Sequence, residues 1–158
     1  MFMKQEKIAL WLKGLVIGLA ILGAIFLIGF TIFAFARKDL NPVTTILGFP
    51  FAVWYSVSMC YVILFHFWHV CQEISRENSF SMENARSFHK MAIGGILLGS
   101  GFLVKLGLVL FGDKITFLYG LFIVFEIIVS IAFVIVCETL SKLILHAYEM
   151  KQENDLTI

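Results

Sequence analysis

The stretch GLVIGLAILGAIFLIGFTIFAFA, residues 14–36, decides the fold, because it contains no charged side chain and is long enough to cross a bilayer. A helix rises about 1.5 Å per residue, so about 20 apolar residues span the hydrocarbon core of roughly 30 Å. Three more apolar runs of similar length follow, at residues 51–70, 91–111 and 115–136. A helix satisfies its own backbone groups in lipid. The sequence therefore predicts an all-α membrane protein whose four transmembrane helices form an antiparallel bundle.

The composition predicts a single integral membrane domain over residues 1–158. Hydrophobic residues make up 60% of the chain and charged residues only 15%, whereas a soluble domain carries about 25% charged residues. Lysines precede the first apolar run as in a secretory signal, but the run exceeds the roughly 7–15 residues of a signal's apolar region. We therefore expect this run to stay in the protein as a helix. The net charge of +1 gives no reason to expect direct binding of nucleic acid.

The positive charges predict the orientation, because cytoplasmic segments carry an excess of Lys and Arg. The N-terminal segment, the loop over residues 72–90 and the tail over residues 138–158 hold eight basic residues, and the other two connections hold three. Both termini and the 72–90 loop are therefore expected on the cytoplasmic side. The tail continues the fourth helix with an apolar stripe at helical period. The stripe consists of Leu140, Leu143, Ile144, Ala147 and Tyr148.

Two connecting segments carry local signals of their own. Asn41-Pro42 joins an N-cap residue to a proline suited to a first helical turn, which predicts a short interfacial helix before Gly48. In the 72–90 loop, Ser81 precedes a helix-compatible stretch and is expected to act as an N-cap. An outer belt of aromatic side chains is expected from Phe49, Phe51, Trp54 and Tyr55.

One lysine and one carboxylate lie inside the apolar runs, Lys105 in the third and Glu126 in the fourth. An isolated charge in mid-membrane costs about 2.5–3.5 kcal/mol on insertion scales. Only Gly112-Asp113-Lys114 joins the two runs, so they form a hairpin that sets both side chains at similar depths. The sequence therefore predicts a buried ion pair. Small residues mark close helix contacts on the third run, and they are Gly94, Gly95, Gly99 and Gly101.

Other polar side chains of the apolar runs extend this interior. His66 and His69 follow two polar residues on one face of the second run, and together with the ion pair they suggest a ladder of titratable groups. Three uses stay open: a structural pair, a ligand or sensing site, and a path for protons or ions. The polar interior comprises Tyr55, Ser58, His66, His69, Tyr119 and Ser130.

The sequence gives no sign of enzymatic chemistry. It lacks a phosphate loop, a nucleophile elbow and paired catalytic carboxylates. His66, His69 and Cys71 have the ligand types of a zinc site, but Cys71 points to a different helical face. We therefore expect neither an enzyme, nor a metal site, nor a cofactor. Three cysteines are an odd number and lie in or beside helices, so a disulfide framework is not expected either.

The segments NSFSMENARSFHKMA, residues 78–92, and EMKQENDLTI, residues 149–158, resemble the two signatures of the bacterial family catalogued as domain of unknown function 2975. The family's middle loop carries a PF-x-x-EN element that leads into the third helix, and its chains close on EEN-DLTI or a similar sequence. Ser79 stands here where the family has proline or another small residue. The matching residues are Phe80, Glu83 and Asn84 in the loop, and Glu153, Asn154, Asp155, Leu156, Thr157 and Ile158 in the tail.

The resemblance implies a multi-pass protein of the bacterial cytoplasmic membrane. The family's genes commonly sit beside a small helix-turn-helix regulator, which implies a membrane protein that holds or controls a transcription factor. The leading hypothesis is therefore a regulatory or sensory protein that binds a cytosolic partner. Its docking residues would be Phe80, Glu83, Asn84 and Arg86 in the middle loop and residues 153–158 in the tail.

The alternative hypothesis places the function inside the membrane. A small transporter, a channel subunit or a peptide-immunity protein could use the polar interior around Lys105, Glu126 and His66. Under either hypothesis the lipid bilayer surrounds the chain, and the sequence is compatible with a homo-oligomer.

Overall fold

The computed structural model of the chain describes residues 5–36, 49–76, 78–110 and 117–156. It contains the helices α1 (Gln5–Ala36), α3 (Phe49–Ser75), α4 (Met82–Leu110) and α5 (Phe117–Leu156), and the described residues include no strand. All four helices are long and apolar enough to cross a membrane. The prediction of an all-α, multi-pass membrane protein with four spans is confirmed.

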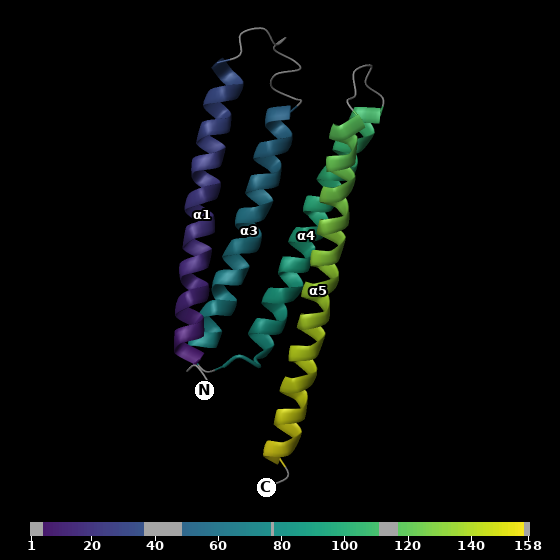
Figure 1. Ribbon diagram of the computed structural model, residues 1–158. Coiled ribbons are helices and arrows are strands. Elements are labelled where there is room, and N and C mark those ends of the chain that lie inside the picture. Colours follow the sequence, from purple (N-terminus) through teal and green to yellow (C-terminus); the bar gives the residue numbers. More distant parts are fainter. Residues whose placement is uncertain (1–4, 37–48, 77, 111–116, 157–158) are drawn as a thin grey trace.

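The helices run antiparallel, and both described ends of the chain lie at the same end of the bundle (Figure 1). We call this the N/C end. The end of α3 and the start of α4 also lie there, while the end of α1, the start of α3, the end of α4 and the start of α5 lie at the opposite end. Which end faces the cytoplasm stays a prediction from the distribution of basic residues.

The helices are longer than the predicted spans, and most of the expected 72–90 loop is helical. Only residues 76–81 separate α3 from α4. Ser81 ends the turn as predicted, because its Oγ accepts a hydrogen bond from the backbone N–H of Asn84 at 3.1 Å. The last helix, α5, continues through the expected tail to Leu156. The predicted interfacial helix after Asn41-Pro42 lies outside the described residues.

Each helix packs mainly on its neighbour in sequence: α1 on α3, α3 on α4, and α4 most extensively on α5. The molecule is therefore a row of helices with α4 between two partners (Figure 1). Its apolar core lies towards the N/C end, where Met91 and Ala92 of α4 meet Cys137 of α5. The side chains packed around these three residues are Ile63, Phe67, Phe88, Phe133 and Val134.

Glycines on two faces of α4 allow both neighbours to approach closely. A Cβ on Gly94 would lie 2.9 Å from Cγ1 of Ile63 on α3, and one on Gly101 would lie 2.9 Å from Cδ1 of Tyr55. On the adjacent face, a Cβ on Gly95 would lie 2.8 Å from a methyl group of Val134 on α5. The prediction that these small residues mark helix contacts is confirmed.

Polar side chains tie neighbouring helices together through backbone carbonyl groups. Tyr61 of α3 donates to the carbonyl of Ala20 on α1 at 2.6 Å, and Tyr55 donates to that of Leu97 on α4 at 2.7 Å. Ser130 of α5 donates to the carbonyl of Gly95 on α4 at 2.8 Å. Hydrocarbon offers no hydrogen-bond partner, so these bonds fix which face of each helix meets its neighbour.

We predict that Gly101→Ala destabilises the protein, because the Tyr55 ring that faces the new methyl group is held by its hydrogen bond to Leu97. Overpacking of this kind costs about 1–3 kcal/mol. Thermal melts in detergent should give a lower midpoint for this variant than for Gly107→Ala. Gly107 is a matched control on the same helix, since no described atom lies within 4 Å of its new Cβ. Equal midpoints would contradict close packing at Gly101.

Candidate functional site

The structure brings the predicted ion pair together. The Nζ atom of Lys105 lies 3.4 Å from Oε2 of Glu126, and it also lies 5.8 Å from the centre of the Phe102 ring. The Lys105 side chain is 18% exposed and that of Glu126 is 41% exposed. Charge-assisted hydrogen bonds between nitrogen and oxygen are typically about 2.7–2.9 Å long. The pair is therefore a loose contact, and its carboxylate is the more accessible half.

The register of the α4–α5 hairpin sets this contact. Ser141 of α5 donates to the carbonyl of Ala85 at 2.7 Å, near the start of α4. One turn further along α4, Nδ1 of His89 lies 2.9 Å from Oε2 of Glu138. This second polar contact was not predicted, although the hairpin register that pairs Lys105 with Glu126 also brings His89 near Glu138.

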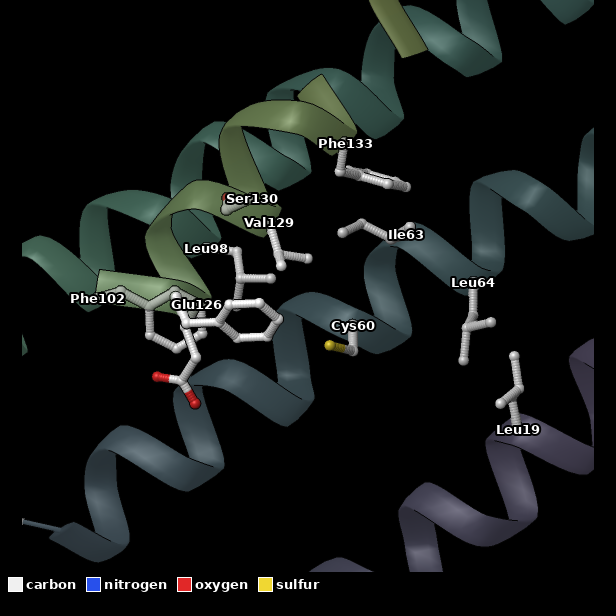
Figure 2. A pocket seen from close by; sticks show the side chains of 11 residues that line it. Leu19, Cys60, Ile63, Leu64, Leu98, Phe102, Glu126, Val129, Ser130 and Phe133 are labelled. Carbon is white, nitrogen blue, oxygen red and sulfur yellow. The ribbon is translucent and has the colours of Figure 1, made fainter. Parts of the chain in front are cut away.

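Two cavities flank Glu126, between α5 on one side and α3 and α1 on the other. The larger measures about 530 Å³ and extends towards the N/C end, to Leu64 on α3 and Leu19 on α1. The smaller measures about 410 Å³ and includes Lys105 and Ser56. Glu126 and Phe102 line both cavities, so the two spaces adjoin at the carboxylate. Figure 2 shows the carboxylate beside the apolar side chains of the larger cavity.

The other predicted polar residues do not form one continuous ladder. Tyr55 and Ser130 are used in hydrogen bonds to backbone carbonyls of α4, and Ser58 is exposed. The rings of His66 and His69 pack edge-on against Phe65, with centroids 5.6 Å and 4.9 Å away. The side chain of Tyr119 lies outside the described residues.

The histidines therefore belong to an aromatic cluster and are not partners of the ion pair. In the part of the chain that the structure describes, no group of three or more His, Cys, Asp or Glu side chains could hold a metal ion. The cysteines of the described helices are free thiols, with Cys71 and Cys137 buried and Cys60 exposed on the wall of the larger cavity.

The turn between α3 and α4 is held by a buried polar network. Glu73 accepts hydrogen bonds from Arg76 at 3.2 Å and from the amide of Asn78 at 3.0 Å. Asn84, which is 1% exposed, donates to the carbonyl of Ser79 at 2.9 Å. The role of Glu73 in this turn was not predicted, because an acidic residue at a helix end is most often solvated.

The predicted docking residues differ in how exposed the structure leaves them. Asn84 is buried, so its place is inside the turn and not on an accessible surface. Phe80, by contrast, is 60% exposed on that turn, and Glu83 and Arg86 are exposed on the first turns of α4. In the tail, Glu153 and Asn154 are exposed on α5, while the side chains of Asp155 and Leu156 and all of Thr157 and Ile158 lie outside the described residues.

Comparison with known proteins gives one family. The model of the family described as "Protein of unknown function (DUF2975)" matches residues 50–158, a range that includes α4, α5 and nearly all of α3. The segments that carried the resemblance lie inside this range, and the resemblance is confirmed. Neither the curated proteins nor the solved structures contain a match to this chain.

We predict that Lys105 and Glu126 are energetically coupled. Glu126→Gln alone leaves the ammonium without its counter-charge and should lower the melting temperature more than the double change Lys105→Met/Glu126→Gln does. Residues in contact show coupling energies of about 0.5–3 kcal/mol. Because the Glu126 side chain is 41% exposed, we expect a coupling energy of about 1 kcal/mol for this pair. A double-mutant cycle of thermal melts measures the coupling. Additive single effects would show that the residues do not interact.

We also predict that Asn84→Ala loosens the turn between α3 and α4. The change removes the hydrogen bond that the Asn84 amide donates to the carbonyl of Ser79, and a hydrogen bond of this kind contributes about 0.5–1.5 kcal/mol. Trypsin should then cleave after Arg76 faster than in the unmodified protein. Glu83→Ala is the matched control, since Glu83 is the exposed neighbour on the same turn of helix. Equal cleavage rates for the two variants would show that Asn84 does not hold the turn.

Proposed function

The chain belongs to the DUF2975 family, and on this premise we propose that it is a membrane-embedded regulatory or sensory protein that binds a cytosolic partner. In this proposal the N/C end faces the cytoplasm of a bacterial cell, as the excess of basic residues at that end favours. The docking surface consists of the turn over residues 76–81 and the part of α5 that extends beyond α4. We call this part, residues 145–156, the α5 extension.

The length of α5 is the observation that carries the proposal. The helix has 40 residues and is therefore about 60 Å long, about twice the thickness of the hydrocarbon core. Ser141 still contacts α4 near its start, so the α5 extension lies past the end of its partner helix. Its 12 residues project by about 18 Å. Figure 1 shows α5 ending beyond the turn that joins α3 and α4.

A projecting helix of this kind supports docking, because it presents side chains that no neighbouring helix covers. In the α5 extension Met150 is 48% exposed between the exposed residues Glu149 and Lys151, and just before the extension Leu143 is 59% exposed. An amphipathic helix of this type binds partners by laying apolar side chains into a groove. On the nearby turn, the 60% exposed Phe80 adds an aromatic side chain, the class that most often anchors protein interfaces.

The identity of the partner rests on the family alone. A small helix-turn-helix regulator is the proposed partner, because genes for such regulators commonly accompany the family. The membrane protein would hold the regulator at the membrane and release it in response to a signal. Direct contact between this chain and nucleic acid is not part of the proposal, since the net charge is only +1.

Transport along a ladder of titratable groups is the less favoured alternative. It would need His66 or His69 to continue the path from Glu126 towards the N/C end. Both rings instead pack on Phe65, and the carboxylate of Glu126 contacts Lys105. The polar interior therefore supports a local site more than a path across the membrane.

We predict that deleting residues 153–158 leaves membrane insertion intact and reduces partner recovery about tenfold, the change that 1.4 kcal/mol of binding energy gives. Affinity purification from the native host in mild detergent, with quantitative mass spectrometry, measures the recovery. Leu103→Ala is the control, because Leu103 is exposed on α4 far from the N/C end. A second deletion, of residues 145–158, removes the whole α5 extension. Unchanged recovery of the same soluble partner after this longer deletion would refute the docking surface.

A further inference from the structure

We propose that the paired cavities beside Glu126 form a binding site for a lipophilic cation. The apolar body of the ligand lies in the larger cavity, and its cationic group is held by the Glu126 carboxylate. This site is separate from the docking surface at the N/C end, and it does not depend on the function proposed above.

The walls of the larger cavity select an apolar body. They are formed by aliphatic and aromatic side chains of four helices, with Leu19 on α1, Ile63 on α3, Leu98 on α4 and Phe125 on α5. Its volume of about 530 Å³ falls within the roughly 300–1,000 Å³ typical of small-molecule sites. Figure 2 shows Leu19, Ile63 and Leu98 on three different helices around the space between them.

The charge at the junction of the cavities selects a cation. Glu126 lines both cavities, whereas Lys105 lines only the smaller one. The carboxylate is also the more exposed member of the pair, at 41% against 18%. Phe102 lines both cavities and Phe125 lines the larger one, and the faces of aromatic rings attract cations. An anionic head group would meet the carboxylate instead, and like charges at short range repel.

Lys105 makes the site exchangeable. Its contact with Glu126 is long, at 3.4 Å, so little hydrogen-bond energy holds the two together. Lys105 also lies five positions before Leu110, the last residue of α4, which is about 7.5 Å along the helix. A lysine stem at that depth can extend to the membrane surface and keep its ammonium in water. An incoming cation therefore takes the place of the Lys105 ammonium beside the Glu126 carboxylate. The carboxylate keeps a positively charged partner throughout the exchange.

Alkylation of Cys60 reports occupancy of the site. Cys60 lies on the wall of the larger cavity, and Figure 2 shows its sulfur in the space that the ligand would fill. Cys71 and Cys137 are 0% and 3% exposed and act as internal references. The protein is reconstituted in nanodiscs and treated with a membrane-permeant maleimide, and peptide mass spectrometry follows each thiol. The probe is dodecyltrimethylammonium, and dodecyl sulfate and dodecanol at equal mole fraction in the bilayer are the comparison amphiphiles.

We expect dodecyltrimethylammonium to slow Cys60 alkylation about tenfold, a change that corresponds to about 1.4 kcal/mol of binding free energy. Dodecyl sulfate and dodecanol should slow it far less. Glu126→Gln should abolish the protection, and the matched control Glu138→Gln should keep it, because Glu138 lies on the same helix outside both cavities. If Glu126→Gln does not fold, Lys105→Met/Glu126→Gln replaces it, since this change removes both charges together. Equal protection by the three amphiphiles, or protection that survives loss of the carboxylate, would overturn the proposal.

Discussion

Hydrocarbon offers no hydrogen-bond partner, and this constraint governs where each polar side chain of the spans can lie. Tyr55 and Tyr61 could each leave a hydroxyl group unsatisfied in lipid, and instead each donates to a backbone carbonyl of a neighbouring helix. Ser130 does the same within the α4–α5 hairpin. These bonds determine the faces that meet, because a rotated helix would leave a donor without an acceptor. The packing of the row of helices therefore depends on the hydrogen bonds of these hydroxyl groups as much as on the fit between apolar side chains.

The two faces of α4 explain why the cavities lie where they do. Gly95 and Gly99 bring α5 close to α4, and Gly94 and Gly101 bring α3 close on the adjacent face. Among the described residues, α1 packs mainly on α3, and the glycines in close contact with α5 lie on α4. Larger side chains such as Phe125 and Ile63 line the larger cavity without filling it. The tight seams and the open space thus come from one arrangement of glycines.

Much of this arrangement could be predicted from the sequence, and the failures have physical causes. Hydropathy and length located the four spans, and a three-residue connection was enough to place Lys105 near Glu126. Helical spacing also put His66 and His69 on one face, but spacing does not reveal that the neighbouring Phe65 packs against both rings. Asn84 was expected at a docking surface, and a matching motif does not show whether a side chain faces a partner or its own turn. The cavities escaped prediction because they depend on gaps between three or more helices.

The α4–α5 hairpin offers a physical link between the membrane site and the N/C end. Glu126 and the α5 extension belong to one uninterrupted helix, and α5 is fastened to α4 at Gly95 and again at Ala85. A ligand in the cavities would press between α5 and α3, where the walls are side chains, while the seam at Gly94 and Gly101 keeps α3 on α4 and acts as the pivot. The hairpin would then move as one body, because separating α4 from α5 would break the hydrogen bonds of Ser130 and Ser141. A displacement at Glu126 would therefore reach the projecting end of α5 without any change in the helix itself.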